Sequence, residues 1–124
     1  MGAQENKQTA RDAYEAFVRG DAEGAMRDID DSIEWTARGQ NTLTGTYHGK
    51  QEVGGLWGKL IGGGFRIEPQ EFIADGDKVI VRTVGSLGEE AIENVDVLTY
   101  DGAGKLVKFD TFGDPKAANR AFAG

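Results

Sequence analysis

Asp96 is the residue whose type and position most strongly suggest chemistry. It stands in the segment ENVDVLTY between Val95 and Val97, and alternation along a strand leaves both faces of this segment mixed. A carboxyl group among apolar side chains has its charged form disfavoured, so its pKa rises and the neutral acid becomes a hydrogen-bond donor. Asp96 therefore either faces an apolar pocket and acts on a ligand there, or lies on the outer face and pairs with Arg82 or Lys78.

Tyr14 and His48 are the two side chains that could assist Asp96. Tyr14 belongs to a helical pattern of apolar residues, which fits either core packing or a hydrogen bond to a ligand. His48 is the single histidine, and its unperturbed pKa near neutrality suits a proton acceptor. Its segment GTYHGK has the composition of a loop, which also fits simple exposure.

Two other acids are weaker candidates. Asp110 is the second choice for a pocket acid, but alternation places it on the same strand face as Lys108, which favours a surface ion pair. Glu34 is the only acid within its expected strand and lies opposite Trp35, hence outside the pocket.

Several large apolar side chains could line such a pocket. Aromatic residues at core spacing are usually only core, but two of them lie on strands that flank the presumed cavity, namely Trp35 and Phe109. The substrate-binding residues we expect are Trp35, Phe17, Trp57, Leu98 and Phe109.

Composition limits the alternatives. A chain of 124 residues with 39% hydrophobic and 28% charged content fits one globular domain, residues 1–124. Its apolar runs are far shorter than a membrane span, and the N-terminal segment lacks the apolar stretch of a secretory signal, so we expect a cytoplasmic protein without a membrane partner. A net charge of −7 disfavours nucleic acid as a partner.

Cofactor and metal motifs are missing. The chain has no cysteine and one histidine, no EF-hand spacing, no glycine in the place that a phosphate-binding loop requires, and no G-x-S-x-G nucleophile turn. We therefore expect no metal and no cofactor.

The elements that must position these residues follow from periodicity. Helices are expected over residues 5–19, from Asp21 to Ile29, and around residues 53–61, where Gly54, Gly55 and Gly58 indicate a close approach of a neighbour or a mobile wall. Strands are expected at 32–37, 65–75, 78–87, 91–100 and 105–112, with residues 38–50 as a loop and a short tail after Pro115. Pro69 confines its strand to an edge or a bulge. Helices first and strands afterwards predict an α+β fold with the helices on one face of a curved sheet.

This order resembles the cone-shaped fold of nuclear transport factor two, ketosteroid isomerase and the SnoaL-like polyketide cyclases, also described as a cystatin-like α+β roll. The resemblance covers nearly the whole chain and is carried by AYEAFVRGDAEGAM, DDSIEWTA, LTGTYHGKQEV, IADGDKVIV and DGAGKLVKFDTFGDP. It implies a curved mixed, mainly antiparallel sheet wrapped around N-terminal helices, a conical pocket for a small apolar molecule, and a homodimer formed through the outer sheet face.

The resemblance also implies an activity. VDVLTYDGAGKLV is similar to the isomerase stretch whose aspartic acid stays protonated and hydrogen-bonds an enolate oxygen, a role that would fall to Asp96 with Tyr14 or His48 assisting. The isomerase base on the first strand is absent, because Thr36 or Ala37 stands there. We therefore expect a cofactor-independent acid/base enzyme acting next to a carbonyl, of the isomerase, polyketide cyclase or dehydratase type. The alternatives are a noncatalytic binder of a small hydrophobic ligand and a dimerising interaction module.

Overall fold

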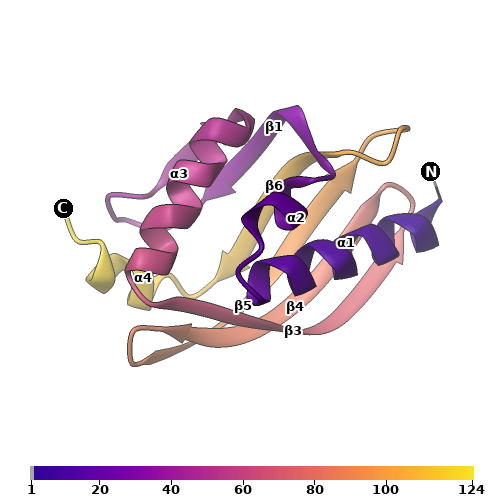
Figure 1. Ribbon diagram of the computed structural model, residues 1–124. Coiled ribbons are helices and arrows are strands. Elements are labelled where there is room, and N and C mark those ends of the chain that lie inside the picture. The colour runs from indigo at the N-terminus through magenta and orange to yellow at the C-terminus, as the bar shows by residue number, and fades with distance from the viewer. Residues whose placement is uncertain (1) are drawn as a thin grey trace.

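The computed structural model describes residues 2–124 as three helices packed on a six-stranded sheet, with a fourth helix at the C-terminal end (Figure 1). The elements in chain order are α1 (Ala3–Val18), α2 (Ala22–Met26), β1 (Ile29–Ala37), β2 (Gly45–His48), α3 (Gly49–Gly62), β3 (Phe65–Asp75), β4 (Lys78–Leu87), β5 (Glu90–Tyr100), β6 (Leu106–Gly113) and α4 (Lys116–Ala121).

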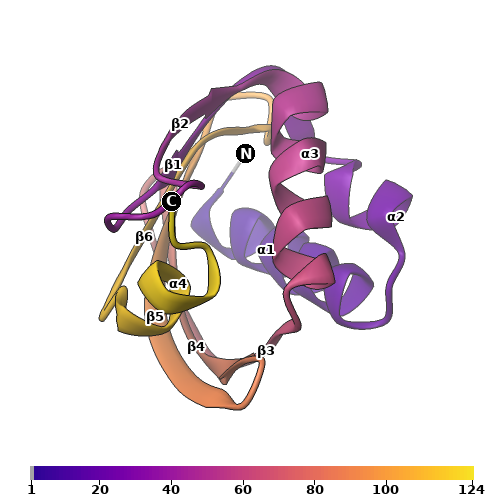
Figure 2. The ribbon, with the colours of Figure 1, turned by 90° about the vertical axis from the view of Figure 1, so that its left-hand side faces the viewer.

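The sheet is mixed but mainly antiparallel. Its strand order is β2-β1-β6-β5-β4-β3, and β1 with β6 forms the parallel pair while the other neighbours run antiparallel. Figure 2 shows the sheet curling around one side of the molecule, with α1, α2 and α3 on its inner side and α4 at one end. The predicted α+β fold, with N-terminal helices on one face of a curved sheet, is confirmed.

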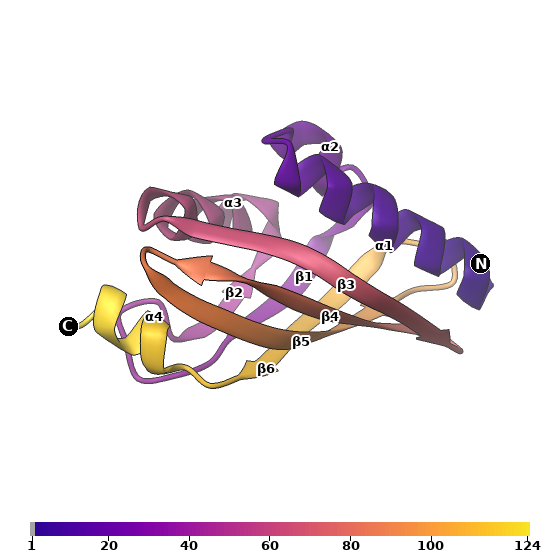
Figure 3. The ribbon, with the colours of Figure 1, turned by 90° about the horizontal axis from the view of Figure 1, so that it is seen from below.

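The inner sheet face and the helices share the core. Helix α1 turns one face toward β3 and β4, and its buried residues Asn6, Ala10 and Tyr14 recur every fourth position, as one face of a helix requires. Val79 and Val81 of β4 meet this layer and are fully buried. Figure 3 shows α1 and α3 on the same side of the sheet, toward its opposite ends. Packing in the core therefore places Tyr14 against the inner face of the central strands.

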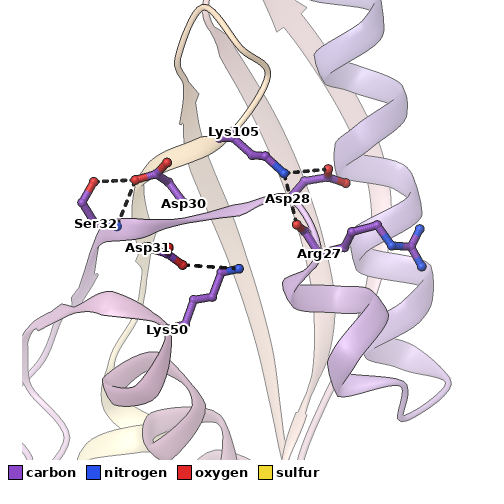
Figure 4. Close-up of polar contacts among 7 residues, drawn as sticks. All are labelled: Arg27, Asp28, Asp30, Asp31, Ser32, Lys50 and Lys105. Atoms are coloured by element: carbon purple, nitrogen blue, oxygen red, sulfur yellow. Dashed lines mark hydrogen bonds and ion pairs between the residues drawn. The ribbon is translucent and has the colours of Figure 1, made fainter.

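Strand β1 begins earlier than the sequence pattern suggested. The second helix ends at Met26, so Ile29 is a buried strand residue and not part of a helix face. The acidic residues near this junction are accommodated by local partners: Asp28 lies 3.7 Å from Lys105, Asp31 lies 3.7 Å from Lys50, and Asp30 accepts from Ser32 (Figure 4). Asp31 is exposed and Asp28 and Asp30 are half-buried, and with these partners their carboxylates are compatible with a strand that begins at Ile29. The helical pattern up to Ile29 did not indicate this strand start.

Two segments expected to be irregular contain regular structure. Residues 38–50 include the short strand β2, which pairs with β1 and leads directly into α3 at Gly49. The tail after Pro115 forms α4. Its Asn119 Oδ1 accepts from the backbone of Gln40 and from the side chain of Asn41, so α4 is tied to the loop after β1.

The glycines of α3 do not share one explanation. A Cβ at Gly54 would lie 3.4 Å from the Met26 side chain, whereas a Cβ at Gly55 or Gly58 would meet no atom within 4 Å. Of the two alternatives for these glycines, a close approach of a neighbour is therefore not found at Gly55 or Gly58. Pro69, in contrast, lies on the edge strand β3 beside a register shift, as its missing N–H requires.

None of the helices within residues 2–124 combines the length and the hydropathy needed to cross a membrane.

Candidate functional site

A cavity of about 210 Å³ lies between the helices and the inner face of the sheet. All five residues expected from the sequence to bind substrate contribute to its wall, namely Phe17, Trp35, Trp57, Leu98 and Phe109. The C-terminal end of the chain also contributes Pro115 and Ala118. For scale, a dry apolar cavity of about 150 Å³ admits benzene, so this one has room for a larger ring system.

A cluster of aromatic rings forms part of the cavity wall. Trp35 and Phe109, which are paired across β1 and β6, stack with ring centroids 3.6 Å apart and an interplanar angle of 11°. Trp57 of α3 meets Trp35 edge to face at 5.6 Å and Phe17 at 5.2 Å. Such a wall suits a planar, largely apolar guest.

Asp96 lies in this wall with two hydroxyl partners. The strand β5 turns Asn94, Asp96 and Leu98 toward the cavity, and the Asp96 side chain is buried. The Tyr14 hydroxyl donates to Asp96 Oδ2 at 2.5 Å, and Thr111 Oγ1 donates to Asp96 Oδ1 at 2.7 Å. Among the described residues no ion pair involves Asp96. The acid is thus held by hydroxyl groups and not by a cation.

The electrostatics of this trio favour an acid that titrates near neutral pH. Burial raises the pKa of Asp96 to about 6, while the hydrogen bonds from Tyr14 and Thr111 act in the opposite direction because they stabilise the carboxylate. Burial and the negative charge of Asp96 raise the pKa of Tyr14 well above its ordinary value. Tyr14 therefore remains a protonated donor, and Asp96, with a pKa of about 6, is mainly ionised at pH 7.

This state differs from the role that the family resemblance implied. The expected neutral aspartic acid would donate a hydrogen bond to a ligand, whereas both oxygens of Asp96 accept hydrogen bonds. An ionised carboxylate has about four acceptor positions, so two protein donors leave positions open toward the cavity. The arrangement can therefore accept a proton from a guest molecule.

The other predicted acid/base residues lie elsewhere. His48 is exposed at the junction of β2 and α3 and is not part of the cavity wall, because the strand β2 occupies the outer edge of the sheet. The expectation that His48 assists Asp96 is therefore corrected. Asp110 accepts from Arg38 Nε at 2.9 Å and from Arg38 Nη2 at 2.7 Å, which makes it an ion-pair partner outside the cavity wall. Glu34 is exposed, as expected.

Thr111 is a member of the trio that the sequence reading missed. Its position opposite Asp96 depends on the register between β5 and β6, which pairs these two residues directly. Tyr14 reaches Asp96 across 82 positions of the chain because α1 packs over the central strands. The hydroxyl at residue 111, two residues after the aromatic Phe109 on the same strand, was the only available signal.

The fold and this pocket define a class of α+β proteins in which helices pack over the inner face of a curved sheet and leave a cavity between them. Residues 10–109 match the family described as the SnoaL-like domain, and the chain belongs to that family. No curated protein matches the chain significantly.

Solved structures of similar fold cover nearly the whole chain. One is an NTF2-like protein of unknown function from Burkholderia pseudomallei K96243, with 27% identity, full coverage of both chains and a TM-score of 0.82. A second, of unknown function and cystatin-like fold, is from Xanthomonas campestris, with 23% identity over 96% of this chain and 98% of that chain and a TM-score of 0.82. A third is TerC co-crystallised with polyporic acid, with 23% identity over 94% of this chain and 96% of that chain and a TM-score of 0.79.

Proposed function

We propose that this protein is a cofactor-independent enzyme that removes a proton from the carbon next to a carbonyl group of a flat, apolar substrate, with Asp96 as the general base. The observation that carries the proposal is a carboxylate buried in an aromatic cavity, held by two hydroxyl donors and free of any cation among residues 2–124. A base with a pKa of about 6 is ionised at neutral pH and yet retains useful proton affinity.

Each residue of the trio has a part in this chemistry. Asp96 takes the proton, and its neutral acid can return that proton to another carbon or to a leaving oxygen. Tyr14 and Thr111 hold the carboxylate in one orientation through their two hydrogen bonds. The stacked Trp35 and Phe109 would bind the planar part of the substrate beside it. Isomerisation, aldol cyclisation and dehydration all begin with this proton transfer, and family membership supports the same range of reactions.

The test measures proton exchange directly. Bicyclic ketones such as 1-indanone and 1-tetralone are incubated with the protein in D₂O, and loss of the proton signal next to the carbonyl is followed by NMR. We expect the wild-type protein to accelerate exchange and Asp96→Asn to lose about 10²-fold or more of that acceleration. The matched variant Asp110→Asn, which alters an acid outside the cavity, is expected to exchange at the wild-type rate. Equal rates for Asp96→Asn and the wild-type protein would contradict the proposal.

One observation favours a second candidate, a noncatalytic binder of a small hydrophobic ligand. Both oxygens of Asp96 already have protein partners, an arrangement that would also serve to fasten α1 to the sheet. Under that alternative, 1-indanone raises the melting temperature through binding to the folded state, but the protein does not accelerate exchange. The two measurements together separate the two functions.

A further inference from the structure

Two neighbouring rows of side chains cross the cavity floor on the three central strands. In the first row, β4 places Val81 and β6 places Thr111 on either side of Asp96. In the second row, Thr83 and Gly113 stand on either side of Asn94. All members of the second row line the cavity. The acid therefore has a polar row next to it on the same sheet face.

Thr83 and Asn94 are polar groups without protein partners. Thr83 as a residue has a relative exposure of 1% and Asn94 is half-buried, and no hydrogen bond to residues 2–124 is made by the Thr83 hydroxyl or the Asn94 carboxamide. Neither group is sealed in the core, because the fully buried side-chain atom without a partner among these residues is Asn6 Oδ1; the Thr83 hydroxyl and the Asn94 carboxamide border the cavity instead. A hydroxyl that borders an apolar cavity without a protein partner is less favourable than an apolar side chain, and valine would fit the Thr83 position, as it does at Val79 and Val81 of the same strand. This pair of free donors facing a cavity indicates that a guest molecule supplies the missing hydrogen bonds.

Gly113 leaves room for the Asn94 carboxamide. A Cβ at residue 113 would lie 2.1 Å from Asn94 Oδ1, so only glycine leaves room for the carboxamide beside β6. On its other side, Asn94 has Thr83 as its cross-strand neighbour. The amide N–H and the Thr83 hydroxyl are two donors on adjacent strands.

The spacing of the two rows fits the proposed chemistry. Residues two apart on a strand are separated by about 7 Å. In the proposed reaction the base contacts the carbon that loses the proton, and the donor contacts the oxygen of the adjacent carbonyl group. The base and the donor are therefore separated by one short C–C–O unit of the substrate plus two contacts of about 3 Å each. A ketone can therefore reach Asp96 with its C–H group and the second row with its oxygen.

We propose that Asn94 and Thr83 form the site for the substrate's carbonyl oxygen and stabilise the enolate that develops when Asp96 removes the proton. The inference rests on the proposed function of Asp96, and it supplies the electrophilic group that this function otherwise lacks. The C–H electron pair moves into the C–C bond, the carbonyl electrons move to oxygen, and the proton goes to Asp96, so the step is balanced. Donors aimed at a developing oxyanion in a cavity of this kind lower the barrier strongly.

The test measures the vibration of the bound carbonyl group as well as the rate of proton exchange. The infrared stretch of 1-indanone labelled with ¹³C at the carbonyl is measured when bound to the wild-type protein and to four variants. The wild-type protein and Asp96→Asn are expected to shift the bound stretch to lower frequency, because both retain the donors. Thr83→Val and Asn94→Leu are expected to lose that shift. The control Thr99→Val makes the same change on the outward face of β5, where Thr99 pairs with Lys78, and is expected to retain it.

The kinetic expectation complements the spectrum. Removing one donor should lower kcat for α-proton exchange about 10²-fold with little change in KM, because the interaction strengthens only as the charge develops. A bound stretch in Thr83→Val and Asn94→Leu equal to that of the wild-type protein overturns the donor assignment. Failure of the ketone to bind the wild-type protein also overturns it. Failure of the base proposal is recognised separately, because Asp96→Asn would then exchange at the wild-type rate while the infrared shift persists.

Discussion

Replacement of Asp96 by asparagine should make the protein more stable at alkaline pH. The side chains are nearly isosteric, and the flanking Tyr14 and Thr111 hydroxyls can each either donate or accept, so the carboxamide can keep two hydrogen bonds. What the substitution removes is the cost of holding a carboxylate in the cavity. The folded-state pKa of about 6 lies above the ordinary value of 3.8.

The magnitude follows from linkage. A gap of about two pKa units corresponds to about 3 kcal/mol at 1.36 kcal/mol per unit. Because the folded state holds the proton more tightly than the unfolded state, Asp96 lowers the free energy of unfolding of the wild-type protein as pH rises from about 4 to about 6. Above that window the full penalty is present, and below about pH 4 it is absent.

The assay is denaturant unfolding of both proteins between pH 4 and pH 8. We expect similar stability at pH 4, and at pH 8 an Asp96→Asn variant that is more stable by up to about 3 kcal/mol, or about 10 °C in Tm. Asp110→Asn is the control; it breaks a partly exposed ion pair with Arg38 and should destabilise by at most about 1 kcal/mol. A variant that is less stable than the wild-type protein at pH 8 would refute the account of a penalised carboxylate.

Three further predictions concern the surroundings of Asp96. Tyr14→Phe removes a hydrogen bond that lowers the pKa of Asp96, so the increase of kcat/KM for proton exchange with pH should occur at higher pH in this variant. An unchanged pH profile would show that Tyr14 does not influence the pKa of the base. His48→Ala should leave kcat/KM within about twofold of the wild-type value, because His48 is exposed and outside the cavity wall; a large loss would restore its catalytic role. Val95 and Phe112 are exposed on the outer sheet face, where we propose that a homodimer forms. Val95→Lys should therefore shift the sedimentation of the protein toward that of the monomer. A wild-type protein that is monomeric at high concentration would contradict the dimer proposal.

Much of the fold could be predicted because local signals agreed with it. Alternation and turn residues gave the four long strands closely, and Pro69 indicated an edge strand through its missing N–H. The end of α2 was less predictable, because Ile29 fits a helical face as well as a strand. Gly55 and Gly58 suggested close packing, but they adjoin no neighbouring atoms, and nothing in the structure explains them.

The site could be predicted only in part, because its geometry depends on contacts between distant segments. Alternation left the face of Asp96 open, and the burial of that side chain is a property of the whole sheet. The helical pattern of apolar residues did not show whether Tyr14 packs in the core or donates a hydrogen bond. In the structure Tyr14 does both, because it is buried and its hydroxyl is hydrogen-bonded to Asp96. Thr111 and the row of Thr83 and Asn94 depend on the register of three strands, which the sequence pattern does not fix.

The central claim is that the Asp96 carboxylate is buried in an apolar cavity and has its proton affinity raised by that burial. A ¹³C NMR titration of the aspartate carboxyl carbons, assigned by comparison with Asp96→Asn, measures this property directly. The account predicts one aspartate with a pKa near 6 whose signal is absent from the variant. An Asp96 that titrates near 4, as a solvated aspartate does, would contradict it.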